Sequence, residues 1–565
     1  MRSKKFLLEI FLLILISIYA FLINYHFGFL GFNYIDSFQH IAGGEKVLDN
    51  QIPFKDYWVA DSGPMMDLMQ GFLFKILNVS WGSLVINASI TNAIFAVTIF
   101  WFCKIIEIGL IPKIILPIIG ATIMYPTSGT PLIDYHALIF SFLGLTCFLY
   151  CLKSRKFKLL IFIPAIFFIS FFFKQVPTSY FIILIIILSI YYYYFKNIKN
   201  IFYLNLLGAI LILFFFIVLV NSLNIDLINI YEQYFVMPIS QFSYRSENFD
   251  TSFFSTSQKI RYVIFLVIPS LLLLFLDYKK KKLNENTTLY ILLFSFFIIA
   301  ALHESYTFNQ AVTLGILPFV SAVIIKLIKK NNYLFLIFCF LNLIILIKLI
   351  TYDIMYSFLL LAFIIILFLK SKKLHSLQGL ILLLIFYSTL TTFYYFEKLT
   401  INRHWQDIYN NDWKIYSKDA SLLDKKLTGL KWISNNPNTE KEFEDFLDNL
   451  TYLKSIKDEG NYILITHYQI YNMILNNKNF SPVKYWWKNG SYPVNNLELK
   501  KKFDSFFIDK INHNNIKKLI ILDDSSIYDS FNINNFNWIK NCSYLDKEKS
   551  SKQKTIIIIN SKCKI

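Results

Sequence analysis

The sequence predicts a multi-pass α-helical membrane protein with about thirteen transmembrane helices and a small C-terminal external α/β domain. Hydrophobic residues make up 56% of the 565 residues and charged residues only 16%, whereas a soluble domain usually carries about 25% charge. The mean hydropathy of +0.49 indicates more apolar surface than one or two soluble cores could bury. Long apolar runs also alternate with short basic clusters through most of the chain.

Apolar runs place the membrane spans, each of which needs about 20 residues. The first group lies near 6–25, 83–103, 110–125, 135–152, 158–173, 176–195 and 201–221. The second group lies near 260–277, 288–302, 311–327, 332–350, 354–369 and 376–396. The first run follows the letters MRSKK and is too long for a signal-peptide core, so we interpret it as a retained signal anchor.

The basic clusters predict how these spans are oriented. If the N-terminus lies inside, the inside segments hold the clusters at 104–113, 153–158, 196–199, 279–282, 326–330 and 370–373. This arrangement satisfies the positive-inside rule. It predicts an inner or plasma membrane protein with a cytoplasmic N-terminus and an external, periplasmic C-terminus. The net charge of +18 then serves membrane orientation, and no nucleic-acid partner is expected.

The predicted boundary lies between a transmembrane domain of residues 1–396 and an external soluble domain of residues 397–565. The second part is polar and contains no further span. Its short apolar segments are typical of buried strands, and a helical stretch is expected over Glu440–Ile456. The expected strands are Tyr462–Thr466, Lys518–Leu522 and Thr555–Asn560. Cys542 and Cys563 would pair in an oxidising compartment, and two free thiols are the alternative.

The two large external loops, 26–82 and 222–259, are where polar residues gather in the membrane half. Asp36 lies about ten residues after the first span, and His40, Lys55 and Asp56 follow it. A solvated loop ordinarily carries such charges, so their presence alone does not define a site. Their order does carry information: Asp36 is followed by Gly-Gly-x-x-x-Leu-x-x-x-x-Pro-Phe-x-Asp, an aromatic-rich stretch and Gly-Pro.

This order resembles the first external loop of the polyprenyl-phosphate-sugar-dependent glycosyltransferases. That GT-C structural class includes protein O-mannosyltransferases and the aminoarabinose transferase that acts on lipid A. The resemblance implies a GT-C-like transmembrane domain and places the essential acidic residue of the loop at Asp36. Ser37 stands where many members have Glu, so the pattern for a two-carboxylate metal site is incomplete. A divalent cation is the only cofactor left open.

Two further segments match the class. Asp134 matches an acidic residue that recurs in the second external loop, and Lys174 with Gln175 matches the turn between the fifth and sixth spans. The resemblance implies a polyprenyl-phosphate sugar as donor, a glycan, lipid or protein as acceptor, and inversion at the anomeric carbon. A carboxylate in hydrogen-bond reach activates an acceptor hydroxyl, so Asp36 and Asp134 are the catalytic candidates.

The leaving lipid phosphate needs positive charge where its negative charge develops. Lys55, Lys174, Arg245 and Arg261 are the cationic candidates for this role. The full set of candidate substrate-binding residues is Lys55, Asp56, His136, Lys174, Gln175, Arg245, His303, Glu304 and Tyr306. Each has a simpler explanation as well: Lys174 as a snorkelling interfacial lysine, Arg245 as a solvated charge, and His136 as a packing residue with local hydrogen bonds.

Two other functions stay open as alternatives. A transporter or flippase of lipid-linked glycans commonly shows paired repeats and charges at the membrane midplane, and neither is evident in the sequence. A surface-glycan polymerase or ligase would be expected to carry its main external loop between late spans. The sequence contains no P-loop, no zinc-type His or Cys pair and no Gly-x-Ser-x-Gly elbow.

Overall fold

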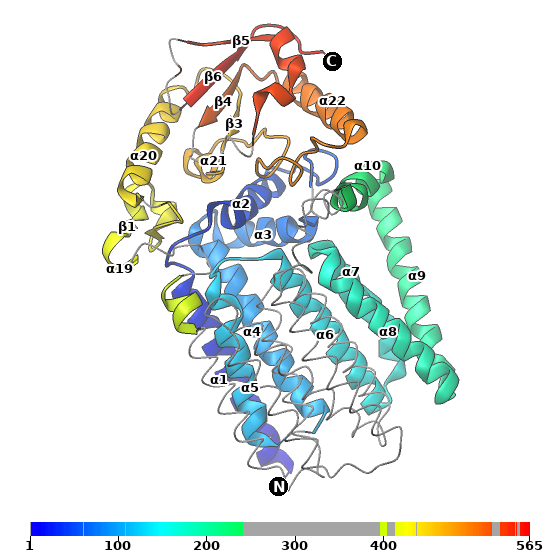
Figure 1. Ribbon diagram of the computed structural model, residues 1–565. Coiled ribbons are helices and arrows are strands. Elements are labelled where there is room, and N and C mark those ends of the chain that lie inside the picture. Colours follow the sequence, from blue (N-terminus) through cyan, green and yellow to red (C-terminus); the bar gives the residue numbers. More distant parts are fainter. Residues whose placement is uncertain are drawn as a thin grey trace, which may run out of the picture.

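The computed structural model describes residues 2–59, 62–107, 109–240, 396–403, 413–436, 438–522, 531–547, 550 and 554–564. Residues up to 240 form a helical bundle with short helices at one end, and residues 413–564 form a sheet-containing region at that same end (Figure 1). We call residues 413–564 the C-terminal region. The predicted spans beyond residue 240 lie outside the described residues, as do Arg245, Arg261, His303, Glu304 and Tyr306.

Apolar helices occupy all seven spans predicted before residue 222. They are α1 (Arg2–Phe27), α4 (Trp81–Ile105), α5 (Leu110–Ile123), α6 (Ile133–Ser154), the 3-10 helix η2 (Phe157–Phe162) with α7 (Ile163–Phe173), α8 (Gln175–Phe195) and α9 (Lys199–Ser222). By length and composition, five of these helices could cross a membrane: α1, α4, α6, α8 and α9. The described part is therefore mostly helical, as a membrane protein of this class requires, and the count of thirteen spans stays a prediction.

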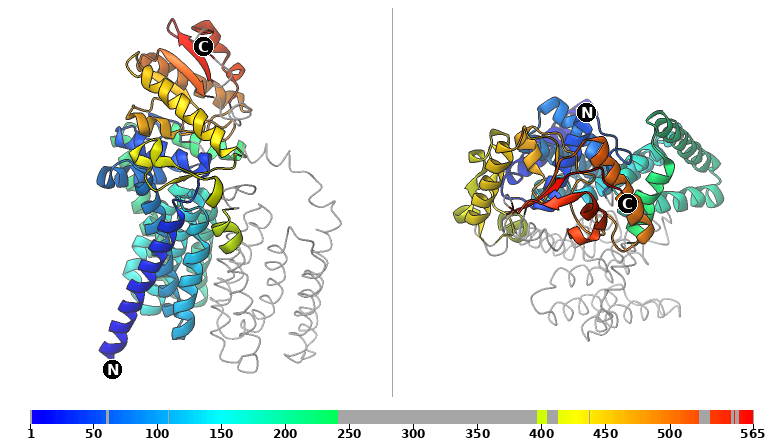
Figure 2. Two further views of the ribbon diagram at one scale, coloured as in Figure 1. Left: turned by 90° about the vertical axis from the view of Figure 1, so that its left-hand side faces the viewer. Right: turned by 90° about the horizontal axis from the view of Figure 1, so that it is seen from above.

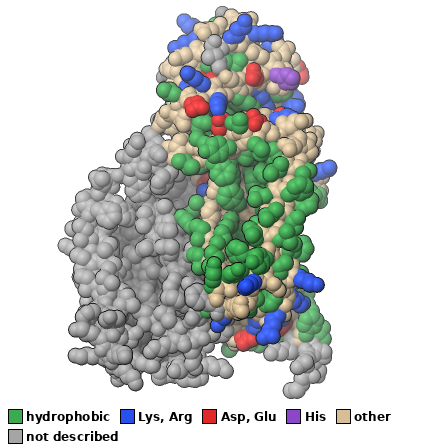
Figure 3. All heavy atoms as spheres, turned by 90° about the vertical axis from the view of Figure 1, so that its right-hand side faces the viewer, with side chains coloured by type: hydrophobic (Ala, Val, Ile, Leu, Met, Phe, Trp, Pro, Cys, Tyr) green, Lys and Arg blue, Asp and Glu red, His purple; other side chains and the backbone are tan. Residues whose placement is uncertain are grey.

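The outer helices of the bundle present large apolar side chains to their surroundings. Phe6 on α1 is 59% exposed and Phe215 on α9 is 61% exposed, whereas most residues of α4 and α6 are buried. Figure 3 shows hydrophobic side chains covering one face of the bundle, with charged side chains gathered above and below them. Lipid tails are the surroundings in which such a surface is stable, because no water needs to be ordered around it.

The connections between the helices alternate between the two ends of the bundle (Figure 1). At the N-terminal end, Glu9 of α1 pairs with Lys104 at 2.7 Å and with Lys113 at 3.4 Å. Lys153 pairs with Glu107 at 2.6 Å. The basic clusters 104–113 and 153–158 therefore share the end that holds the N-terminus.

The opposite end, which we call the loop end, consists of residues 28–59, 62–80, 124–132, 174–175 and 223–240. Its elements are α2 (Tyr34–Leu48), α3 (Pro64–Leu77), the 3-10 turn η1 (Tyr125–Thr127), α10 (Leu227–Tyr231) and the π-helical turn η3 (Glu232–Val236). Asn33 caps α2 by accepting hydrogen bonds from the backbone N–H groups of Ile35 and Asp36. Gly43 lets α3 lie close to α2, because a Cβ there would lie 2.2 Å from Asp67 Oδ1.

The C-terminal region contains a four-stranded sheet in the order β3-β4-β6-β5. Strands β3 (Tyr462–Ile465) and β4 (Lys518–Leu522) are parallel, and β6 (Lys554–Ile559) is antiparallel to β4 and to β5 (Ser543–Leu545). The helices are α20 (Thr439–Ser455), α21 (Ile470–Leu475) and α22 (Leu497–His513). The three predicted strands and the predicted helix are present, each within one residue of its expected limits.

Short elements complete the described residues. They are η5 (Phe396–Ile401), α19 (Trp413–Tyr416), β1 (Lys418–Asp419), η7 (Ala420–Leu422), η8 (Lys425–Leu427), β2 (Lys431–Trp432), η9 (Ile533–Asn535) and η10 (Asn537–Asn541). Strands β1 and β2 form a separate two-stranded sheet. This part of the chain reaches back to the bundle, since the Lys431 N–H donates to the Phe29 carbonyl at 2.8 Å.

The hydrophobic core joins the C-terminal region to the loop end. Phe32 and Phe38, next to and within α2, share one buried cluster with Trp432 and Phe446. Trp58 of the first loop belongs to a second cluster, which fills the space between the sheet and α22. Figure 2 shows the C-terminal region lying on α2 and α3 in a second view. The first loop is therefore packed between the bundle and the C-terminal region.

The structure pairs Cys542 with Cys563, which are 21 positions apart. Replacing both with serine is expected to lower the free energy of unfolding by about 3 kcal/mol, because the bond restricts the unfolded chain over a loop of this length. Thermal unfolding of the purified protein with and without reductant measures the effect. Cys147→Ala removes a thiol without removing a disulfide and serves as the control. Equal unfolding temperatures in the double variant and the parent would contradict this prediction.

Candidate functional site

An ion pair at the loop end unites two residues that the sequence analysis named separately. Asp134 lies in the first turn of α6, and Lys174 lies between α7 and α8. Lys174 Nζ is 2.6 Å from Asp134 Oδ2, and the two side chains are 29% and 24% exposed. The pair is therefore partly open to a ligand. A phosphate group could compete with the carboxylate for the ammonium, because both are strong charge-assisted acceptors.

Asp36 lies at the same end of the bundle, at the start of α2. It is exposed, and its backbone N–H donates to Asn33 Oδ1 at 3.2 Å. The next residue, Ser37, has its Oγ 3.0 Å from Thr130 Oγ1, four positions before Asp134. The first turn of α2 thus contacts the segment that precedes α6 at the loop end. Both carboxylates lie in first helical turns, at the positive end of the helix dipole.

Three other candidate residues contact the backbone at the loop end. Lys55 Nζ donates to the Leu223 carbonyl at 3.1 Å, at the end of α9, and stays exposed. The Asp56 Oδ2 accepts from the Ile52 N–H at 2.6 Å. Gln175 Nε2 donates to the Tyr234 carbonyl at 2.5 Å. The Lys55 and Gln175 contacts hold loops of the loop end to one another, whereas the Asp56 contact lies within the first loop.

His136 is buried in the bundle and hydrogen-bonded on both sides of its ring. Nε2 lies 3.0 Å from Thr91 Oγ1 and 3.1 Å from Asn87 Oδ1. Nδ1 contacts the Tyr125 hydroxyl and lies 3.2 Å from the Leu132 carbonyl. These contacts match the simpler explanation of His136 as a packing residue with local hydrogen bonds.

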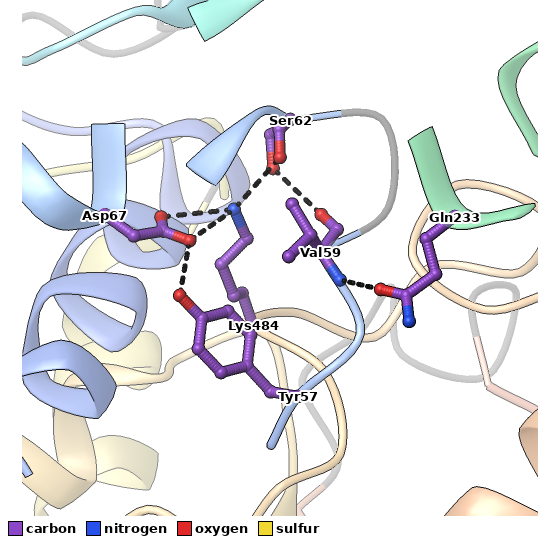
Figure 4. Close-up of polar contacts among 6 residues, drawn as sticks. All are labelled: Tyr57, Val59, Ser62, Asp67, Gln233 and Lys484. Carbon is purple, nitrogen blue, oxygen red and sulfur yellow. Dashed lines mark hydrogen bonds and ion pairs between the residues drawn. The ribbon is translucent and has the colours of Figure 1, made fainter. Parts of the chain in front are cut away.

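A buried network under α2 is the feature that sequence reasoning missed (Figure 4). Lys484 of the C-terminal region lies 3.0 Å from Asp67 Oδ2, and the two side chains are 1% and 0% exposed. The Tyr57 hydroxyl donates to the same Asp67 oxygen at 2.9 Å. Burial raises the pKa of Asp67, while Lys484 and Tyr57 oppose that rise. Lys484 is 417 positions from Asp67, and no motif in the sequence connects them.

His40 lies beside this network, one helical turn after Asp36 on α2. It is fully buried, and within the described part of the chain neither ring nitrogen has a hydrogen-bond partner. Burial and the charge of Lys484 hold the pKa of His40 well below its ordinary value, so the ring is neutral. A buried polar group without a partner costs stability. Such groups are more common at functional sites than in ordinary cores.

Lys46 forms a second tie between α2 and the C-terminal region. Its ammonium is buried and donates to the carbonyls of Asn479 at 3.1 Å and Ser481 at 2.6 Å. Burial lowers the pKa of Lys46 well below its ordinary value. Gln51 Nε2 also donates to the Asn479 carbonyl, at 2.9 Å. The segment from Asn479 to Lys484 is therefore anchored to the first loop at both of its ends.

The described residues contain no group of three His, Cys, Asp or Glu side chains that could hold a metal ion. Asp134 is paired with Lys174, and Asp36 is followed by Ser37 rather than by a second carboxylate. We therefore derive no catalytic step through a metal.

No protein-family model matches this chain, and no curated protein matches it. The function must be argued from the chemistry of the loop end.

Proposed function

We propose that this chain is an integral membrane glycosyltransferase that transfers a sugar from a polyprenyl-phosphate donor to a glycan, lipid or protein acceptor on the outer face of the membrane. The observation that carries the proposal is the partly exposed Asp134–Lys174 ion pair at the loop end, the end of the bundle at which Asp36 is also exposed. It combines carboxylates with a cation at one end of an apolar bundle, as a lipid-phosphate substrate requires.

In the proposed reaction Asp36 is the general base. It takes the proton of the acceptor hydroxyl as that oxygen forms a bond to the anomeric carbon. The bond from the anomeric carbon to the phosphate oxygen breaks, and the phosphate leaves with the electron pair. Lys174 stabilises the negative charge on the leaving phosphate, while Asp134 orients the acceptor. A single displacement of this kind inverts the anomeric carbon.

The membrane arrangement supports the same proposal. The isoprenoid tail would lie among lipids beside the apolar helices, and its phosphate would reach the loop end. The described basic clusters 104–113 and 153–158 lie at the opposite end, which the positive-inside rule assigns to the cytoplasm. The Cys542–Cys563 disulfide lies at the loop-end side of the molecule, and disulfides persist in oxidising compartments outside the cytoplasm.

Asp36→Asn is expected to reduce sugar transfer by about 100- to 10,000-fold while the protein still folds, because the amide cannot accept the proton. Membranes that contain the variant are assayed with radiolabelled polyprenyl-phosphate sugars and a crude acceptor fraction. Asp49→Asn, an exposed carboxylate at the other end of α2, is the matched control. Full activity of Asp36→Asn would show that another group is the base. Substrate-dependent uptake without a transfer product would favour the transporter alternative.

A further inference from the structure

We propose that Lys484 of the C-terminal region is a positioning residue of the site: it holds Ser62 and Gly63 against the end of α7 and so sets the position of Lys174. The effect on sugar transfer rests on the proposed function. The contact between the first loop and the end of α7 can be tested without measuring any activity.

Lys484 binds the first loop through Ser62 and Asp67. Its ammonium donates to Asp67 Oδ1 at 3.1 Å and to the Ser62 carbonyl at 3.4 Å, and it forms an ion pair with Asp67 Oδ2 at 3.0 Å, all within that loop. Figure 4 shows the ammonium between Asp67 and Ser62. A lysine ammonium has three N–H donors and no acceptor, so this arrangement can use its full donor capacity and fix two points of the loop at once.

The backbone next to Ser62 is in direct contact with the backbone next to Lys174. The Gly63 N–H donates to the Phe173 carbonyl at 3.0 Å. A Cβ at Gly63 would lie 1.9 Å from the Phe172 carbonyl oxygen, so no space separates the two chains. Phe173 directly precedes Lys174, whose ammonium pairs with Asp134. Close-packed backbones transmit displacement, so a shift of Ser62 and Gly63 moves the residue that carries the site cation.

The loop is also held on its other side. The Val59 N–H donates to Gln233 Oε1 at 3.0 Å, and Gln233 Nε2 donates to the Phe54 carbonyl at 3.2 Å. Gln233 follows α10, so this anchor comes from the bundle, whereas Lys484 comes from the C-terminal region. Without Lys484 the Ser62 carbonyl would lose its charged donor. Of these two anchors, only the hydrogen bonds of Gln233 would then hold the loop.

The buried Lys484–Asp67 pair is better explained by its effect on the position of the first loop than by its effect on the stability of the fold. Removing two charges from water offsets much of their attraction, and an apolar pair of similar volume is often equally stable. Directional hydrogen bonds to Ser62 and Asp67, in contrast, cannot be reproduced by apolar side chains. An apolar replacement of both partners therefore separates the contribution to folding from the contribution to position.

The test uses the double variant Lys484→Met with Asp67→Leu in the full-length protein in lipid nanodiscs. We expect its unfolding temperature to fall only by the effect of the Tyr57 hydroxyl, which loses Asp67 as its acceptor. Amide hydrogen exchange in a peptide covering 171–175 should become about tenfold faster or more, because the end of α7 is no longer held by the contact of Gly63 with the Phe173 carbonyl. The kcat/KM for the donor is expected to fall by about 100-fold, as a misplacement of about 1 Å at a reactive centre can cause.

Lys46→Met is the matched control, since Lys46 is another buried lysine between α2 and the C-terminal region and does not bond Ser62. Its exchange at 171–175 should equal that of the parent. Unchanged exchange in a folded double variant would overturn the inference. Faster exchange in a protein whose parent transfers no sugar would support the positioning contact and count against the proposed function instead. If the double variant does not accumulate, Lys484→Gln, which keeps two N–H donors but loses the charge and the third donor, is measured in the same way.

Discussion

Gly63→Ala is expected to disrupt both the stability and the activity of this protein. The added Cβ would lie 1.9 Å from the Phe172 carbonyl oxygen and 2.8 Å from that of Phe173. Both obstacles are backbone atoms, which cannot rotate away as a side chain can. Overpacking of this kind typically costs about 1–3 kcal/mol, and we expect a loss near the top of that range. Thermal unfolding in detergent or nanodiscs measures it.

The cause of this loss can be isolated, because the backbone of Gly63 has φ −61° and ψ 160°, a conformation that alanine adopts readily. The effect should therefore be steric and should displace Lys174. Gly82→Ala is the control: its added Cβ meets no atom closer than 3.7 Å, and alanine in the first turn of α4 should be neutral or slightly stabilising. A Gly63→Ala variant as stable and active as the control would contradict the close contact between α7 and the first loop.

Trp432→Ala is expected to lower the free energy of unfolding by about 3–5 kcal/mol, as truncations of large buried aromatic residues do. Trp432 is fully buried, with ring centroids 4.7 Å from Phe32 and 4.8 Å from Phe446. Phe32 precedes α2 and Phe446 lies in α20, so the cavity would form at the junction of the loop end and the C-terminal region. Limited proteolysis should release C-terminal fragments from the variant faster than from the parent.

The control for Trp432 is Trp487→Ala, also in the C-terminal region. Trp487 is 41% exposed, so its loss should remove little buried area. Comparable destabilisation by the two variants would mean that the Trp432 cluster does not join the two parts of the molecule.

Much of the fold was predictable because it depends on local composition. A bilayer requires long apolar helices, and α1, α4, α6, α8 and α9 were recognisable from uninterrupted apolar runs. The two shorter segments were predicted as full spans although α5 has only 14 residues and α7 only 11, because apolar flanking residues extend the hydropathy signal beyond the α-helical part. Strand β4 was recognisable because its last four residues, 519–522, form a continuous apolar run, as a strand buried on both faces requires.

The candidate site was predictable in its members more than in its contacts. Asp134 and Lys174 could both be named from loop patterns, but their ion pair could not, because they are 40 positions apart and lie on different helices. Two explanations of His136 followed from the sequence, and only the structure gives its four hydrogen-bonding neighbours, which match the explanation as a packing residue. Asp67 had been only one of several charges in the first loop until its partner from the C-terminal region was known.

The amino-acid sequence is sufficient to predict a mostly helical protein with membrane-length apolar helices and, in the described residues, the end of the bundle at which the polar loops lie. These properties follow from hydrophobic length and charge distribution, which act over one or two helical turns or over one span. The partnership of Lys484 with Asp67 and Ser62 is of another kind. It exists because the C-terminal region packs on α2 and α3 and removes all three groups from water, and that packing depends on contacts between residues more than 400 positions apart.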